Sequence, residues 1–536
     1  MGHAAGPGEI KTDFMFDIFG LREQMTGFSD DCMVLYQQQQ RKGVNTLIYT
    51  TLDLVGGQLA KRIDEIVSAD MAGEQKQWME EGRRYYAGHH DILGKDFTRS
   101  AVEETALNDD GKEVETVNVF SSPNRSNHKN INPFHRILVD QKTAYLTGRE
   151  PSVSAKEGAP EKMNDFLTRW ADEKFALTIQ DMTTEAANKG FSAAHIYYDE
   201  EGKLGYALIP SEQLIPIFDS TDREVLAGMI RYYQKPVVEN GQRKMKSMVE
   251  YWTEDTVTIF TKNEGGREWK TWEKPHWVSV SQQEGKSLAH GWGRPPFLLL
   301  KNNADMTGDL TLIKGLIDAY DLISSEGTND FLDLVGLYWA VCGYSGETAK
   351  AIARKRQVNR AVNVSDASGS IEARQVNLPV EGRIEFLRML RRDIFHFGMG
   401  IDVDSELFGT SPSGVSLKFR YAQLDLKANA IAVRLKRLIR EMARFFIEDH
   451  NRRNGDSWDW KDVEVSLNRT MITNDKETVE MIASSQGLVS RRTLLMKHPF
   501  VEDINDEMSR RPMAADGKEQ TNGADEGRKQ QTDVKG

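Results

Sequence analysis

The feature that most restricts the fold of this sequence is a pair of helical segments separated by a basic insert. In the first segment, residues 308–333, apolar side chains recur at spacings of three and four: Leu310, Ile313, Ile317 and Tyr320. This predicted helix carries six acidic residues and one basic residue, whereas the insert 334–379 carries six basic and three acidic residues. A second helix is predicted over 380–397, and a loop rich in glycine, serine and aspartate over 398–414. This order is typical of a helical wall with a basic end protruding from it.

The longest amphipathic pattern in the chain follows this loop. Its apolar residues step by four and three: Leu424, Ala428, Ile431, Leu435, Leu438, Met442 and Phe445. Arginines occupy the other faces, and we interpret that charged side as solvated or facing another subunit rather than as a DNA-binding surface. A short strand is predicted near 463–467 and further helix over 475–496. Residues 503–536 are polar and almost free of large apolar side chains, which predicts a disordered tail.

Upstream of these helices the pattern changes from helix to strand. Helix is predicted over about 46–86, directly after Asn132-Pro133, and over 162–189, with a loop region between the first two. From 190 to 300, short runs separated by turns predict a β-rich unit. We interpret its five tryptophans as packing residues rather than as a stacking platform for bases. The predicted fold class is α+β and predominantly helical.

The bulk composition excludes several classes of protein. The formal net charge is −12, and a protein that wraps nucleic acid tightly is normally basic, because its cations neutralise phosphates. The two cysteines, Cys32 and Cys342, form neither a disulfide framework nor a C-x-x-C zinc site, and they fit a reducing compartment. The N-terminus lacks a signal-peptide pattern, and no apolar stretch approaches the roughly 20 residues of a membrane span. We therefore expect a soluble protein that is cytoplasmic when it is made.

The sequence contains no motif of a catalytic or metal site. It has no G-x-x-x-x-G-K-[ST] run to bind nucleotide phosphates, and His89-His90-Asp91 lacks the H-E-x-x-H spacing of a zinc helix. Asp402-Val403-Asp404 resembles the start of a calcium loop but lacks the glycine and the bidentate glutamate that complete one. Gly343-Tyr344-Ser345-Gly346 fails the spacing of a nucleophile elbow by one residue. We expect no catalytic residue, no metal and no cofactor, and hence no enzyme.

Several blocks of the sequence, taken in their order, closely resemble portal proteins of long-tailed bacteriophages. The first block is 132–151, and the second is a hairpin that ends in Ile215-Pro216-Ile217. The most specific blocks follow one another closely: Gly291-Trp292-Gly293-Arg294-Pro295-Pro296, Asn302-Asn303, Gly308-Asp309-Leu310, the run 313–321, Ser325, and Asn329-Asp330. The last is Ser413-Gly414 followed by Leu417-Lys418. The resemblance covers roughly residues 60–450.

This resemblance implies a conical ring of about twelve subunits at one vertex of the capsid. Its regions are expected as follows: wing 1–307, stem helices 308–333 and 380–397, a small α/β clip 334–379, tunnel loop 398–414, long wing helix and return 415–469, and helical crown 470–502. The expected cargo is double-stranded DNA, passed without sequence specificity. The expected partners are the terminase, head-completion or adaptor proteins, the major capsid protein and scaffolding proteins, with no membrane. The protein is then part of the virion and passes through the host cytoplasm during assembly.

Three groups of charged residues are candidates for the function that the resemblance implies. The acids of the tunnel loop, Asp402, Asp404 and Glu406, have no basic neighbour inside the loop, so a ring of them would repel phosphate and let a duplex slide. The stem candidates are four acids of the first helix: Asp318, Asp321, Glu326 and Asp330. The candidates for docking acidic partners are three bases of the clip: Arg354, Lys355 and Arg356.

Two other functions remain open on the sequence alone. One is an enzyme of nucleic-acid metabolism such as a packaging ATPase, which the missing phosphate loop argues against. The other is a structural component of the virion without a pore. An assay of ATP turnover tests the first, and electron microscopy of the purified protein separates rings with a central hole from monomers or sheets.

Overall fold

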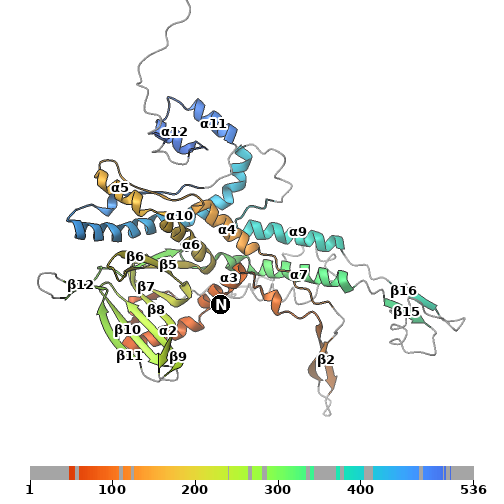
Figure 1. Ribbon diagram of the computed structural model, residues 1–536. Helices are drawn as coiled ribbons and strands as arrows, with labels where there is room; N and C mark the ends of the chain where they lie inside the picture. The colour runs from red at the N-terminus through yellow and green to blue at the C-terminus, as the bar shows by residue number, and fades with distance from the viewer. Residues whose placement is uncertain are drawn as a thin grey trace, which may run out of the picture. The chain divides into compact units, whose positions relative to one another are not determined.

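The computed structural model combines helices and sheets throughout the residues that it describes (Figure 1). The described residues are 48–54, 59–107, 113–121, 126–239, 241–263, 269–280, 287–333, 338–342, 370–374, 380–403, 414–469, 475–498, 500–501 and 507–508. They fall into two compact units, Met1–Ser405 with Tyr421–Thr470 and Glu406–Arg420 with Met471–Gly536. The mixture of helix and sheet confirms the α+β class that the sequence predicts.

The predicted helical stretch of residues 46–86 is divided in the structure. Strand β1 (Tyr49–Thr50) and a 3-10 turn (Thr51–Leu54) come first, and helices α2 (Leu59–Ala72) and α3 (Glu74–Tyr86) follow. Gly73 separates the two helices because its backbone is extended, with φ −74° and ψ 153°. The apolar periodicity therefore identified helix correctly, but it did not reveal the break.

The other helices of the first half begin and end at the residues that local chemistry favours. Helix α4 (Phe134–Thr147) starts after Pro133 and ends at Gly148, as predicted. The predicted helix 162–189 consists of α5 (Glu161–Trp170) and α6 (Glu173–Lys189). The Asp172 carboxylate accepts a hydrogen bond from the backbone N–H of Phe175 and so caps the start of α6. Helix α6 ends at Gly190, whose φ of 93° is a left-handed conformation.

The β-rich unit predicted between residues 190 and 300 is present. Its larger sheet has the order β1-β7-β8-β9-β10-β11, in which β1 is parallel to β7 and the other pairs are antiparallel. The strands added to β1 are β7 (Leu214–Phe218), β8 (Leu226–Glu239), β9 (Gln242–Trp252), β10 (Thr256–Asn263) and β11 (Lys270–Pro275). A smaller antiparallel sheet has the order β14-β5-β6, from β14 (Phe297–Lys301), β5 (Phe191–Tyr198) and β6 (Leu204–Ile209). Strands β12 (Trp277–Val280) and β13 (Ser287–His290) form a separate hairpin.

Two apolar clusters hold helices α2 and α3 against these strands. In one, residues of α2 pack against the large sheet: Ile63, Ile66 and Val67 on Ile215, Ile217, Ile230, Val249 and Phe260. In the other, Met79 of α3 packs with Phe191, Phe218, Phe297 and Met306. Full burial of one such side chain contributes roughly 1.5–3 kcal/mol. Trp252 packs on the second cluster and Trp292 stacks on Tyr198 with ring centroids 5.6 Å apart, which agrees with packing roles for these two tryptophans.

The sequence prediction missed strands in two regions. The predicted loop before Asn132 contains the hairpin of β2 (Arg99–Leu107) and β3 (Glu113–Ser121). No local pattern predicts a strand in the insert 334–379, for which the resemblance implies a small α/β clip, and it contains the paired strands β15 (Tyr338–Cys342) and β16 (Ser370–Arg374). Strand β4 (Ser152–Ala155) pairs with β17 (Val463–Ser466), from which it is distant in sequence. Strand formation depends on the partner strand more than on local preference, which explains these omissions.

The remaining helices agree closely with the predicted ones. A 3-10 turn (η6, Asp309–Leu312) precedes α7 (Lys314–Asp333), so the first helix of the pair begins six residues later than predicted. Helices α9 (Val380–Phe397) and α10 (Gly414–Asn454) follow, and the predicted apolar face of α10 is buried from Leu424 to Phe445. In the second unit lie α11 (Asp475–Ser484) and α12 (Arg491–Lys497). The tail 503–536 lies outside the described residues, except for residues 507–508.

Candidate functional site: helices α7 and α9 and their anchors

Helices α7 and α9 pack against each other as an antiparallel pair (Figure 1). At the end of α7 and the start of α9, the Arg383 guanidinium donates to the Asp330 carboxylate at 2.8 Å. At the other end, the ring of Phe134 contacts both Tyr320 of α7 and Phe395 of α9, with centroids 4.9 and 5.9 Å apart. The pair is therefore fixed at both ends, and the insert 334–379 leaves from and returns to the same end.

One face of α7 is covered by segment 126–132, which is joined to the helix by a regular ladder of hydrogen bonds. Backbone N–H groups of alternate residues donate to α7 side chains spaced by four: Ser126 to Asp333, His128 to Asn329, Asn130 to Ser325, and Asn132 to Asp321. The Asn329 amide also donates to the carbonyl oxygen of His128 at 3.1 Å. The ladder satisfies the main chain of a segment that forms no sheet or helix of its own.

The regularity of this ladder follows from the rise per residue of the extended segment and of the helix. Two residues of a nearly extended chain rise about 6.6 Å, and four residues of an α-helix rise about 6.0 Å. A polar side chain at every fourth position of α7 therefore meets every second backbone N–H of the segment. Ser325, Asn329 and Asp330 belong to the sequence blocks described above. The side chains of Ser325 and Asn329 accept hydrogen bonds here from backbone N–H groups of the segment.

The acids in the first half of α7 point into the protein, toward α3 and the loop after it. Lys314 donates to Asp318 at 2.8 Å and to Asp91 at 2.6 Å, and the Tyr85 hydroxyl also donates to Asp318. Burial alone would lower the pKa of Lys314, but its two carboxylate neighbours outweigh burial and raise that pKa. Burial raises the pKa of Asp318, and Lys314 opposes this rise. This cluster fastens α7 to α3 rather than presenting free negative charge.

Asp321 is fully buried and is bound from two sides. Its carboxylate lies 2.5 Å from Nδ1 of His90, and it accepts hydrogen bonds from the backbone and side-chain amides of Asn132 at 2.9 and 2.8 Å. The His90 ring stacks on that of Tyr85 with centroids 4.4 Å apart. His90, which was considered as part of a metal motif, is therefore a structural partner of α7.

A buried cluster of three charges lies where α4, η6 and α10 meet. Asp309 accepts from Lys142 of α4 at 3.2 Å and pairs with Lys427 of α10 at 2.9 Å. Asn302 accepts from Lys142 at 2.6 Å and donates to Asp309 at 2.9 Å. Lys427 also donates to the carbonyl oxygen of Gly398, directly after α9, at 2.8 Å.

The electrostatics of this cluster are set by two cations that share one anion. Burial alone would raise the pKa of Asp309, but Lys142 and Lys427 outweigh burial and hold that pKa well below its ordinary value. Burial lowers the pKa of Lys142 to about 8, although Asp309 opposes the shift. The surplus positive charge faces the carbonyl end of α9, where the helix dipole is negative. The cluster therefore ties the start of the segment after α9 to η6 and α4.

The structure gives different surroundings to the charged residues singled out from sequence. The stem candidates Asp318 and Asp321 are interior anchors, held by Tyr85 and His90, which are partners that the sequence does not show. Asp330 pairs with Arg383, and Glu326 is half-buried. Asp402 forms a bidentate pair with Arg391 of α9 at 2.7 and 2.9 Å, so its charge is compensated from outside the loop. Asp404, Glu406, Arg354, Lys355 and Arg356 lie outside the described residues.

Sequence reasoning missed the partners that hold these acids. No local pattern marks Lys142, Lys427 and Asn132 as partners of buried acids. The one available signal was the spacing of four between Asp321, Ser325 and Asn329. That spacing places them on one face of α7, but it does not show what covers the face.

Within the described residues, no helix is long and apolar enough to cross a membrane. The same part of the chain contains no group of three or more histidine, cysteine, aspartate or glutamate side chains placed to hold a metal ion.

Comparison with known proteins supports the interpretation of the sequence blocks. The family described as "Phage portal protein, SPP1 Gp6-like" matches residues 70–523. The portal protein of Bacillus phage SPP1 is 29% identical over 438 residues, which cover 80% of this chain and 82% of that protein. The portal protein of Clostridium phage phiCD119 is 26% identical over 466 residues, which cover 83% of this chain and 94% of that protein.

The matched range includes the α7–α9 pair and every anchor described above. The chain is thus a bacteriophage structural protein. It belongs to the SPP1 Gp6-like family of phage portal proteins, and its function is that of a phage portal.

Proposed function

We propose that the chain assembles into a ring-shaped homo-oligomer of about twelve subunits, which forms the DNA channel at the unique capsid vertex. The observation that carries this proposal is the antiparallel α7–α9 pair. It is closed by Asp330 and Arg383 at the end where the insert emerges, and anchored through Gly398 at the other end. A rigid two-helix element fixed in this way suits a channel wall that must keep its shape while DNA passes.

In this arrangement the regions keep the boundaries expected from sequence. The stem is 308–333, which contains η6 and α7, together with 380–397, which contains α9. The clip is 334–379, the tunnel loop 398–414 and the crown 470–502. The parts 1–307 and 415–469 form the wing. The three-charge cluster around Asp309 then joins the wing to the base of the tunnel loop.

DNA is cargo in this proposal, and the chain does not read its sequence. The formal net charge of −12 per subunit opposes adhesion of a duplex to the channel. Because Asp318 and Asp321 are occupied as anchors and Asp402 is paired, Asp404 and Glu406 are the tunnel-loop acids assigned to repel phosphate. Replacing Asp404 and Glu406 by serine tests this role: packaged genome length should change, and an unchanged length refutes it.

The protein acts without catalysis, and the energy for packaging comes from a separate terminase. Terminase and head-completion or adaptor proteins dock on the clip through Arg354, Lys355 and Arg356, and the major capsid and scaffolding proteins contact the wing. The protein is located at the portal vertex of the virion, after assembly in the host cytoplasm. Replacement of the three clip bases should weaken terminase or adaptor binding, and the purified protein should not turn over ATP.

Electron microscopy of the purified full-length chain tests the ring. Rings with a central hole of duplex width are expected, and monomers or sheets contradict the proposal. Asp330→Arg should reduce the yield of rings, because two arginines then meet between α7 and α9. The exchange Asp330→Arg with Arg383→Asp is the matched control, and it should restore the yield.

A further inference from the structure

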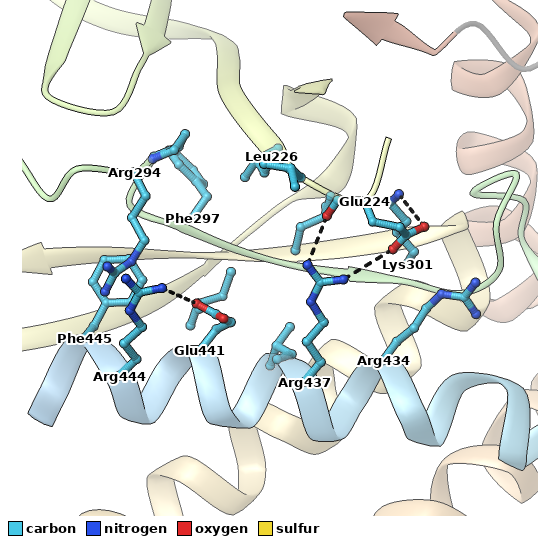
Figure 2. Close-up of a pocket in the computed structure, with 15 residues that line it drawn as sticks. Glu224, Leu226, Arg294, Phe297, Lys301, Arg434, Arg437, Glu441, Arg444 and Phe445 are labelled. Atoms are coloured by element: carbon cyan, nitrogen blue, oxygen red, sulfur yellow. Dashed lines mark hydrogen bonds and ion pairs between the residues drawn. The ribbon is translucent and has the colours of Figure 1, made fainter. Parts of the chain in front are cut away.

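A groove beside α10 combines an apolar floor with an unusual excess of basic side chains (Figure 2). It has a volume of about 290 Å³ and lies between α10, strand β14 and the turn before β8. Leu226, Leu299 and Leu438 belong to its apolar lining. Five basic and two acidic residues line it, so the lining has a net positive charge.

The cations of the groove differ in how fully they are paired. Lys301 and Arg437 share Glu224, at 3.3 and 3.7 Å (Figure 2). Arg434 forms no ion pair within the described part of the chain and donates to the carbonyl oxygen of Ala430 at 3.1 Å. At this end of the groove, the three cations Lys301, Arg434 and Arg437 therefore have a single carboxylate, that of Glu224, among the lining residues near them.

At the opposite end of the groove, Arg294 has one nitrogen atom without a hydrogen-bond partner. The Arg294 guanidinium packs 4.0 Å over the ring of Phe445 and pairs with Glu448 at 2.8 Å. Its Nε atom is buried and has no hydrogen-bond partner. One end of the groove therefore has an arginine without a carboxylate partner within the described residues, and the other end has a buried arginine nitrogen without an acceptor.

The apolar floor distinguishes between two kinds of anionic ligand. A nucleic-acid backbone would leave leucine side chains facing phosphates and sugars, whereas a peptide with acidic and aromatic residues satisfies the floor and the basic rim together. The groove is also small, because its volume is at the lower end of the range for small-ligand sites. These properties favour a peptide segment that inserts a few large side chains.

The first described residue of the chain shares an apolar cluster with two residues that line this groove. Ile48 packs on the same apolar cluster as Leu226 and Leu299, both of which line the groove. Strand β1, which follows Ile48, pairs with β7 at Ile217 and Phe218, next to the turn that carries Glu224. Residues 1–47 therefore connect to the fold within reach of the groove.

The sequence before Ile48 contains a segment with the required chemistry. Residues 13–19 read Asp-Phe-Met-Phe-Asp-Ile-Phe, with two acids, three phenylalanines and no base. The chain between Phe19 and Ile48 can span up to about 100 Å, so its length does not limit access. We propose that residues 13–19 dock in this groove of their own chain, with Asp13 and Asp17 at the arginine-rich rim and the aromatic residues on the leucine floor.

Disulfide trapping in the full-length chain tests this proposal. Phe19→Cys is combined with Val225→Cys on the rim of the groove, after Cys32 and Cys342 are replaced by serine. Under mild oxidation an intrachain disulfide is expected, seen as a linked peptide by mass spectrometry and as a mobility shift at the mass of one chain. The matched control is Phe19→Cys with Ile137→Cys, because Ile137 is 40% exposed on α4 and does not line the groove.

Charge exchange then tests the chemistry of recognition. The double variant Arg434→Glu, Arg437→Glu should slow the trapping reaction about tenfold, because a tenfold weaker docking of residues 13–19 lowers the docked fraction by about that factor. Adding Asp13→Arg and Asp17→Arg to that variant should restore the rate, and this also shows that the variant is folded. Trapping no faster than in the control, or insensitive to these charges, overturns the proposal. A disulfide formed between chains also overturns it and assigns the groove to a second copy.

Discussion

Replacing Asp309 by asparagine leaves the buried Lys142 and the partly buried Lys427 without their shared carboxylate. Removing one partner of a buried ion pair typically costs about 3–5 kcal/mol, because an uncompensated charge remains in the interior. Lys142 can avoid that state by losing its proton, since its pKa is already about 8. At pH 7, deprotonation limits the contribution of Lys142 to the loss of stability to about 1.4 kcal/mol, the free energy that corresponds to one pKa unit. Loss of the charged hydrogen bond to Lys427 adds about 1.5–3 kcal/mol. We expect a total loss of about 3–4 kcal/mol.

Amide hydrogen exchange in α4 and η6 is the appropriate assay, because a chain of 536 residues is not expected to unfold in one step. The free energy of the opening that exposes these amides should fall by about 3–4 kcal/mol in the variant. Asp425→Asn is the matched control: Asp425 is 40% exposed and pairs with Arg469, so its replacement should cost less than about 1 kcal/mol. A loss for Asp309→Asn no larger than that of the control refutes the reasoning.

The pH dependence of the same variant is a second check. Because the pKa of Lys142 is lowered in the folded protein, this lysine is mostly neutral at pH 9 in the unaltered chain. The part of the Asp309→Asn penalty that comes from Lys142 should therefore disappear between pH 7 and pH 9, a decrease of about 1.4 kcal/mol. A penalty that stays constant across this range contradicts the assignment of Lys142 as the titrating group.

Three further predictions concern other buried groups. Asn329→Leu removes both hydrogen bonds to the backbone of His128 and should cost about 2–4 kcal/mol, measured as faster exchange of the His128 amide. Burial lowers the pKa of His135 to about 4, so on acidification the unfolded chain binds a proton at this histidine before the folded chain does. The free energy of unfolding should therefore fall by about 3 kcal/mol between pH 6.5 and pH 4. His135→Gln should flatten this part of the stability–pH profile. Gly190→Ala should lower the melting temperature or prevent folding, because φ is 93° and a Cβ would lie 1.9 Å from the Met306 oxygen; an unchanged melting temperature would contradict this geometry.

Most helices could be predicted from sequence because their signals are local. The periodicity from Leu424 to Phe445 identifies α10, and Pro133 with Gly148 delimits α4. Break points were less accessible, as at Gly73, because a single glycine is compatible with a continuous helix. The paired strands β15 and β16 have no local signal for a different reason, since each gains its stability from a partner about thirty residues away.

The family, the order of the segments and the α7-insert-α9 arrangement could be predicted without the structure, because these depend on ordered motifs and on helical spacing. The role of the acids of α7 became visible only from the contacts in the folded chain. Asp318 and Asp321 look like solvated charges in sequence, and in the structure they are anchors for Tyr85, His90 and Asn132. The physical reason is that a carboxylate becomes buried only where donors from distant segments satisfy it. Such donors are brought together by the fold and leave no local trace in the sequence.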